Sequence, residues 1–274
     1  GGKTLDAARA VASKLKLPVV NCPSLASSDA PCSALSVIYK EDGSFDSYQV
    51  YGRNPDLVLV DTQLIANAPT RLLISGMGDA LATMFEAEAS IKSGANNMRG
   101  GKSTMTAGVI ARTCYQTLLS DGAKALDAVN ENRIDEHVER VVEANTLLSG
   151  LGFESSGLAA AHAVHDGLTS LKPTHDYYHG EKVAFGTIVE LVMEKQEQSV
   201  LDEVLGFANT IGLPVTLAQL GLADASEADL RLVAEQAVQP DKTIHNEPFE
   251  VNATIVYDAI READSVGRAF SARA

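Results

Sequence analysis

Four of the six histidines lie within residues 157–186, close enough in sequence to serve one chemical site. His162 and His165 are three apart in an alanine-rich apolar segment, so both rings fall on one face of a predicted helix. His175 and His179 are four apart and precede a second apolar segment. Two helices joined by a loop, each offering an imidazole, suit a divalent metal, which usually takes a third, acidic ligand from elsewhere. The spacing also allows helix-capping or surface roles for these histidines.

Two aspartates are candidates for that acidic role or for binding a substrate. Asp79 follows Gly76-Met77-Gly78, and we expect it to begin a helix that runs to about residue 91. In a first helical turn it could partner the helix dipole as readily as a metal. Asp29 lies in a loop of small residues, 23–31, which could line a polar pocket or form turns.

The first residues have the pattern of a phosphate-binding turn. Gly1-Gly2-Lys3-Thr4 enters a predicted helix, and free backbone N–H groups at such a turn can face an anion. A turn of this kind normally follows a β-strand, and no strand precedes it in this sequence. We therefore expect the chain to start within a nucleotide-binding unit and to lack that unit's N-terminal part.

The elements that must position these residues change type near Asp61. Short strands are predicted at residues 17–20 and 57–60, with a hairpin over residues 36–51 around Asp42-Gly43. After Asp61, a predicted helix cap, the pattern becomes helical. Glycines 122, 150, 180 and 212 are predicted to separate long helices, expected at residues 104–119, 134–149, 181–193, 200–211, 227–237 and 251–263. We therefore predict an α/β domain over residues 1–61 and an all-α domain over residues 62–274.

Composition limits the class of partner. The 274 residues carry a formal net charge of −14, which argues against nucleic acid because phosphate binding needs a basic surface. No apolar run reaches the roughly 18 residues of a membrane span. Cys22, Cys32 and Cys114 lack the spacing of a metal site or a disulfide framework, so reduced thiols and a cytoplasmic location are expected.

Five motifs in order along the chain carry a family resemblance. They are the opening GGKTLD, the loop ASSDAP, the segment SGMGDALAT, the pair GFES and AAH, and HGEKV, at residues 1–6, 26–31, 75–83, 152–162 and 179–183. Together they resemble the iron-containing alcohol dehydrogenase family, in its polyol (glycerol dehydrogenase) branch, over the whole chain. The resemblance implies a partial dinucleotide-binding domain followed by a helical metal-binding domain, the architecture of dehydroquinate synthase.

The resemblance also implies site residues. Asp79, His162 and His179 would bind the metal, and Asp29 would contact the polyol. Thr83 stands where iron-dependent relatives carry a further histidine, which favours Zn²⁺. The residues implied to contact NAD are Gly2, Lys3 and Thr4 at the diphosphate and Ser24, Ser27, Ser33, Leu35 and Tyr39 along the nucleotide.

The implied activity is NAD-dependent, zinc-dependent oxidation of glycerol to dihydroxyacetone by hydride transfer, in a homo-oligomer for which an octamer is one form. Two alternatives stay open. The first is a non-catalytic, metal-binding oligomerisation fragment. The second is a lyase similar to dehydroquinate synthase, which uses a metal and NAD on a similar scaffold.

Overall fold

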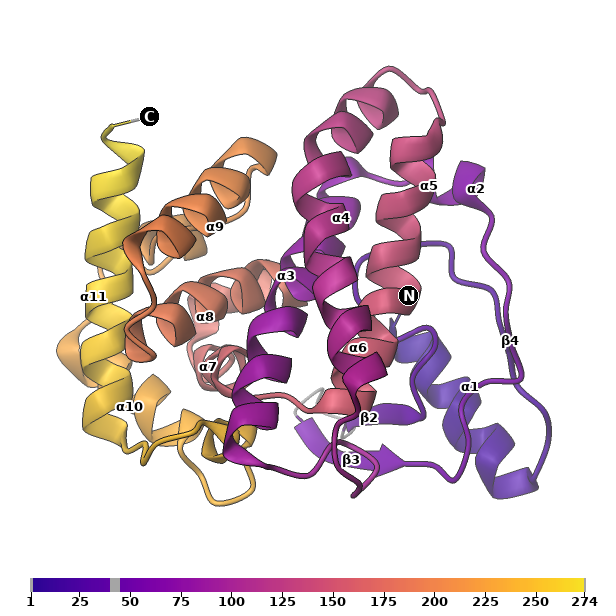
Figure 1. The fold of residues 1–274 in the computed structure, drawn as a ribbon, viewed down its shortest axis with the longest axis horizontal. Helices are drawn as coiled ribbons and strands as arrows, with labels where there is room; N and C mark the ends of the chain where they lie inside the picture. Colours follow the sequence, from indigo (N-terminus) through magenta and orange to yellow (C-terminus); the bar gives the residue numbers. More distant parts are fainter. Residues whose placement is uncertain (1, 40–44, 274) are drawn as a thin grey trace.

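The structure, a computed structural model, describes residues 2–39 and 45–273. An N-terminal α/β region with helix α1 (Gly2–Leu15) and four short strands lies on one side of a mostly helical part (Figure 1). Helices α3 to α6 lie between this region and the C-terminal helices α8 to α11 (Figure 1). The predicted change from α/β to helical structure near Asp61 is confirmed, since the structure continues there with helix α2.

The strands form two small sheets. Strands β1 (Val20–Asn21) and β4 (Leu57–Val58) pair in parallel. The strand predicted at residues 17–20 overlaps β1 only at Val20, and the strand predicted at residues 57–60 extends two residues beyond β4. Strands β2 (Leu35–Tyr39) and β3 (Phe45–Val50) form the predicted antiparallel hairpin. The predicted Asp42-Gly43 turn lies outside the described residues.

Hydrogen bonds made by a buried ion pair within helix α1 attach this helix to the segment that follows β1. Arg9, which is 2% exposed, lies 2.6 Å from the Asp6 carboxylate and donates to the Ser33 carbonyl at 2.8 Å. The Ser36 hydroxyl donates to the Asp6 carbonyl at 3.0 Å. These bonds fix residues 30–36 against the first two turns of α1.

The remaining helices occupy most of residues 62–271. Their bounds are α2 (Thr62–Ala66), α3 (Thr70–Ser93), α4 (Met105–Asn130), α5 (Glu136–Glu143), α6 (Ser149–Ser156), α7 (Ala160–Leu168), α8 (His179–Met193), α9 (Gln198–Ile211), α10 (Glu227–Ala237) and α11 (Ala253–Ser271). Asp61 caps α2 as predicted, accepting from the Gln63 and Leu64 amides. Within the described residues, no helix is both long and apolar enough to cross a membrane.

Glycine positions produced the main errors in the predicted helix boundaries. Asp79 does not begin a helix but lies in the middle of α3, and Gly122 and Gly150 lie inside α4 and α6. A Cβ on Gly76 would stand 1.9 Å from the Ala26 carbonyl oxygen, so glycine is needed here for close packing. Locally such a residue has low helix propensity, but tertiary packing overrides that preference.

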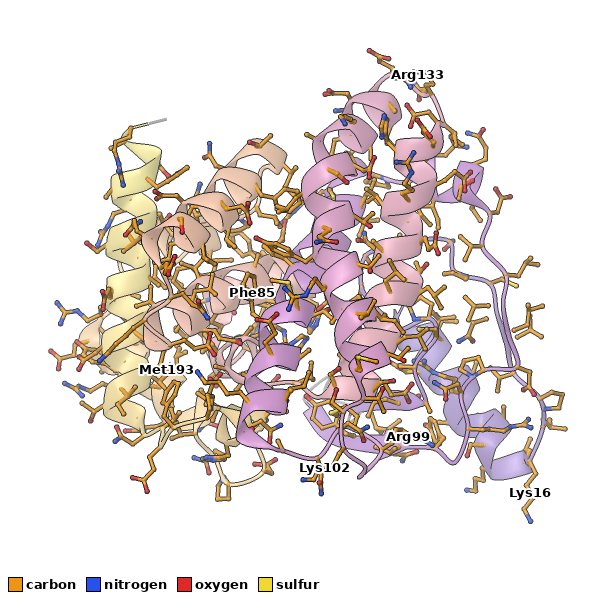
Figure 2. All side chains as sticks on the ribbon, viewed as in Figure 1. Lys16, Phe85, Arg99, Lys102, Arg133 and Met193 are labelled. Carbon is orange, nitrogen blue, oxygen red and sulfur yellow. The ribbon has the colours of Figure 1, made fainter. Side chains whose placement is uncertain are left out.

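The helical core forms where α3, α4, α7 and α8 pack together. Phe85 of α3 meets Tyr115 of α4 edge to face, with ring centroids 5.2 Å apart. Phe185 of α8 is fully buried. Phe85 points into the molecule, whereas the exposed Lys16 after α1 points away from it (Figure 2). Helices α3, α7 and α8 also carry the candidate metal ligands, so this core fixes their relative positions.

Candidate metal centre

Asp79, His162 and His179 converge from three helices. The Asp79 Oδ1 atom lies 2.9 Å from His179 Nε2 and 3.3 Å from His162 Nε2. One ligand atom from each of the three residues lies within 4.8 Å of the other two. One carboxylate and two imidazoles are a ligand set that suits a catalytic zinc site with a further position for water or substrate.

Close helix packing places His179 beside Asp79. His179 is the first residue of α8, and Gly180 follows it at a point where α8 touches α3. A Cβ on Gly180 would stand 1.7 Å from the Ser75 carbonyl oxygen and 2.8 Å from the Asp79 nitrogen. Only glycine allows the two backbones to approach this closely.

His162 is oriented by Glu86, a residue that the sequence analysis did not identify. The His162 Nδ1 atom lies 2.6 Å from Glu86 Oε2, and this contact leaves His162 Nε2 directed at Asp79. Glu86 Oε1 also accepts from the backbone amides of Ala159 and His162, at 2.9 and 3.0 Å. A carboxylate that holds a histidine ring in this way fixes its tautomer and raises its basicity as a ligand.

His179 is held by a second chain of polar groups. Its Nδ1 lies 3.0 Å from His165 Nε2, and His165 Nδ1 lies 3.1 Å from Asp166 Oδ1. Asp166 in turn accepts from the Lys242 ammonium at 2.9 Å. Burial and the neighbouring His179 lower the pKa of His165 to about 3, so its ring is neutral. His175 lies apart, with Nε2 on the Thr169 carbonyl.

The electrostatics of Asp79 fit a cation. Burial would raise the pKa of this fully buried carboxyl, but His179 and His162 hold it well below its usual range. Asp79 Oδ2 accepts from the Asp29 amide at 3.0 Å, whereas Oδ1 has no hydrogen-bond partner among the described residues. A buried, ionised oxygen without a hydrogen bond, facing two imidazole nitrogens, matches the donor that a divalent metal requires.

Asp29 lies beside this cluster. Its Oδ2 accepts from the Ser149 hydroxyl at 3.0 Å, and that hydroxyl lies 2.8 Å from the Thr83 hydroxyl. Burial and the Asp79 carboxylate raise the pKa of Asp29 well above its usual value. Thr83, one turn after Asp79, therefore serves to orient Asp29 through Ser149.

Comparison with known proteins identifies the family. The model of the iron-containing alcohol dehydrogenase family matches residues 1–62. A glycerol dehydrogenase of Thermotoga maritima is 54% identical over 98% of this chain and 74% of its own length. The chain belongs to the glycerol dehydrogenases of the iron-containing alcohol dehydrogenase family. The family resemblance seen in the sequence is confirmed.

Two further relatives are similar to this chain over nearly its whole length. The solved structure of glycerol dehydrogenase from Schizosaccharomyces pombe aligns with a TM-score of 0.97 at 42% identity, over the whole chain and 70% of its own length. This confirms the predicted fold, a partial α/β region followed by a helical part. A glycolaldehyde reductase of Halobacterium salinarum is 52% identical over 98% of this chain and 73% of its own length.

The residues implied to contact NAD lie in α1, in the segment that follows β1 and in β2. Gly2, Lys3 and Thr4 form the first turn of α1, where Lys3 and Thr4 are exposed. Ser33 is buried and is bonded to Arg9, with 3.3 Å between its hydroxyl and the guanidinium. Their cofactor contacts remain predictions.

The other implied cofactor residues differ in exposure. Ser24 is exposed, whereas Ser27 is half-buried and its carbonyl accepts from the Ser75 hydroxyl at 3.2 Å. Leu35 and Tyr39 are the first and last residues of β2, and the Tyr39 side chain lies outside the described part. These roles too remain predictions.

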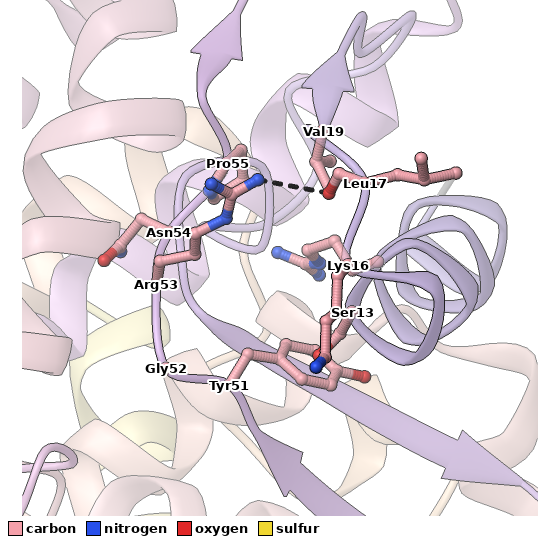
Figure 3. A pocket seen from close by; sticks show the side chains of 10 residues that line it. Ser13, Lys16, Leu17, Val19, Tyr51, Gly52, Arg53, Asn54 and Pro55 are labelled. Atoms are coloured by element: carbon pink, nitrogen blue, oxygen red, sulfur yellow. Dashed lines mark hydrogen bonds between the residues drawn. The ribbon is translucent and has the colours of Figure 1, made fainter.

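A cavity of about 280 Å³ lies apart from the candidate metal ligands. It is lined from the end of α1 and from residues 51–55, and none of Asp79, His162 and His179 lines it (Figure 3). Arg53 spans it to donate to the Leu17 carbonyl at 3.1 Å (Figure 3).

Proposed function

We propose that this chain catalyses the NAD-dependent, zinc-dependent oxidation of glycerol to dihydroxyacetone. The observation that carries the proposal is the convergence of Asp79, His162 and His179 around a buried carboxylate oxygen that has no hydrogen-bond partner among the described residues. Relatives named glycerol dehydrogenase, more than 50% identical to this chain, support the choice of substrate.

The three clustered residues would hold the zinc ion, and His162 and His179 would present Nε2 to it. Zn²⁺ would act there as a Lewis acid on the substrate hydroxyl, and NAD would supply the hydride acceptor. Glu86 and His165 would keep the two rings in the required tautomers, because each can accept a hydrogen bond from the Nδ1–H of its histidine. Thr83, in place of a further histidine, supports zinc over iron.

Asp29 would bind the polyol. The Ser149 hydroxyl donates to Asp29 Oδ2, and the Asp29 backbone amide donates to Asp79 Oδ2. These two bonds fix the Asp29 carboxyl beside the candidate metal ligands. From there Asp29 can accept a hydrogen bond from a substrate hydroxyl and orient the carbon that loses hydride. The charge of a bound Zn²⁺ would offset the effect of burial and of Asp79 and favour the ionised form of Asp29. A hydrogen bond to the ionised carboxylate contributes roughly 1.5–3 kcal/mol.

The cofactor would bind at the first turn of α1. Gly2, Lys3 and Thr4 would meet the diphosphate, because the first N–H groups of a helix are free to bind anions. Ser24, Ser27, Ser33, Leu35 and Tyr39 would follow the nucleotide. Residues 1–61 would thus form the cofactor domain and residues 62–274 the metal and substrate domain. A homo-oligomer and a cytoplasmic location stay predictions.

Glycolaldehyde reduction is a second candidate, favoured by the relative with that name at 52% identity. The relatives named above are dehydrogenases or reductases, which supports redox chemistry over ring formation by a lyase. The deciding experiment measures NAD reduction with glycerol and NADH oxidation with dihydroxyacetone and glycolaldehyde, before and after metal removal. Zinc-dependent turnover that favours the glycerol–dihydroxyacetone pair is expected. Turnover that survives metal removal, or a strong preference for glycolaldehyde, would contradict the proposal.

A further inference from the structure

We propose that Glu190, Glu194 and Glu247 bind a second divalent cation, at a site separate from Asp79, His162 and His179. One carboxylate oxygen from each glutamate lies within 4.8 Å of the other two. Oxygens that share a Ca²⁺ ion at about 2.3–2.6 Å lie up to about 5 Å apart, so this spacing fits one ion. Glu190 lies in the last turn of α8, Glu194 is the C-cap residue of that helix, and Glu247 follows a short 3-10 turn (Thr243–Asn246).

Within the part of the chain that the structure describes, two oxygens of this triglutamate cluster have no hydrogen-bond partner. Glu190 is fully buried and Glu247 is 4% exposed, yet Glu190 Oε1 and Glu247 Oε2 have no hydrogen-bond donor among the described residues. The other oxygen of each glutamate accepts from the start of α7, Glu190 from the Ala161 amide at 2.7 Å and Glu247 from the Ala160 amide at 3.1 Å. Buried carboxylate oxygens without donors are rare, because leaving them unsatisfied is costly.

The surrounding charge is too negative for three free carboxylates. Lys92 is the cation that acts on Glu194, while Glu88 and Glu86 add further negative charge. Burial, Glu194 and Glu86 raise the pKa of Glu247 to about 8, and burial with Glu247 raises that of Glu190 as well. At neutral pH the cluster must therefore hold either protons or a cation.

The ligand chemistry selects the class of ion. All three side chains offer carboxylate oxygen, which suits hard cations such as Ca²⁺, Mg²⁺ and Mn²⁺ rather than ions that prefer sulfur or imidazole. Glu194 is half-buried, so the cluster is reached from the surface on its side, where water can complete the shell.

The proposed ion would stabilise the helix that carries His162. Glu190 accepts a hydrogen bond from the Ala161 amide and Glu247 accepts one from the Ala160 amide, and these two alanines immediately precede His162. Bound in their ionised form, the two carboxylates would hold the start of α7 more strongly than when protonated, because charged acceptors form stronger hydrogen bonds.

The test uses the full chain loaded with zinc, titrated with CaCl₂ at pH 8 while thermal unfolding is followed. We expect a saturable rise in melting temperature of several degrees, by linkage of binding to folding, and one bound calcium per chain beyond the zinc. Mn²⁺ in place of Ca²⁺ should give an anomalous diffraction peak between Glu190, Glu194 and Glu247.

Glu194→Gln should remove the calcium response without changing zinc content, and Glu247→Gln is a second variant if the first does not fold. Glu262→Gln, an exposed change of equal charge on α11, is the control and should keep the response. The proposal is overturned if CaCl₂, MgCl₂ and MnCl₂ up to about 10 mM leave the zinc-loaded protein unshifted, or if Glu194→Gln and Glu247→Gln shift as much as the control. Because none of these readouts is activity, failure here is distinct from failure of the proposed dehydrogenase function.

Discussion

Gly180→Ala tests whether contact between α3 and α8 sets the geometry of the metal centre. The added Cβ would stand 1.7 Å from the Ser75 carbonyl oxygen, half the 3.4 Å at which ordinary contact begins. The obstacle is backbone, which cannot rotate away as a flexible side chain can. The start of α8 must therefore move away from α3 by about 1.7 Å, taking His179 with it.

That displacement is large for a metal ligand. Ligand distances in metal sites hold to about ±0.2 Å, so a shift of more than an ångström at His179 should weaken Zn²⁺ binding at least tenfold. Overpacking of this kind also lowers the free energy of unfolding by about 1–3 kcal/mol. Competition with a chromophoric zinc chelator measures the affinity, and urea unfolding of the metal-free protein measures the stability.

Gly206→Ala is the matched control. It makes the same change inside α9, where the nearest atom to the new Cβ is 3.8 Å away on Phe270. It should raise the free energy of unfolding by about 0.5–1 kcal/mol, since alanine favours the helix more than glycine does, and should leave zinc affinity unchanged. If folded Gly180→Ala binds zinc within twofold of the parent chain, packing at this point does not set the ligand geometry.

Three further outcomes are expected. Asp29→Asn should retain zinc but lower kcat/KM for glycerol about tenfold to a hundredfold. Ser149→Ala should give a smaller loss. Unchanged kinetics in Asp29→Asn would refute the role of Asp29. Glu86→Gln should weaken zinc binding about tenfold to a hundredfold, because one amide oxygen cannot serve all three donors of the carboxylate; equal affinity by chelator competition would disprove this. In chelator, the free energy of unfolding should fall as pH rises from about 4.5 to 8, because folded Glu247, with a pKa of about 8, keeps a proton that the unfolded chain has lost. Glu247→Gln should flatten this dependence relative to the parent; an unchanged slope would contradict it.

The sequence predicted the two histidine helices because their signals are local. His162 and His179 lie at or near the starts of apolar helices, and the structure places those starts together as expected. The prediction that Asp79 begins a helix was wrong, because Gly76 and Gly78 look like a helix break when only neighbouring residues are considered. Glycine is needed at these two positions because the helix backbone lies directly against the backbones of Ala26 and Gly180. No local sequence pattern encodes that contact.

Glu86 could have been found once α3 was known to be continuous. Asp79, Thr83 and Glu86 are spaced by four and three residues, so they share one helical face. A buried helical face that holds an acid, a hydroxyl and a second acid is typical of a site. When the helix is assumed to begin at Asp79, this residue is explained by its place in the first helical turn. The shared face with Thr83 and Glu86 then gives no reason to predict a site.

The start of α7 shows why the rest could not be predicted locally. This helix has nine residues, too few to be stable alone, and Ala159 supplies no side-chain cap. Its first amides are bonded instead by three buried glutamates, with Glu86 on Ala159 and His162, Glu247 on Ala160 and Glu190 on Ala161. Each of these glutamates is 29 to 87 residues away in sequence from the amide that donates a hydrogen bond to it. The position of His162 therefore depends on carboxylates brought together only by the fold, and burial favours a proton or a bound cation on two of them, Glu190 and Glu247.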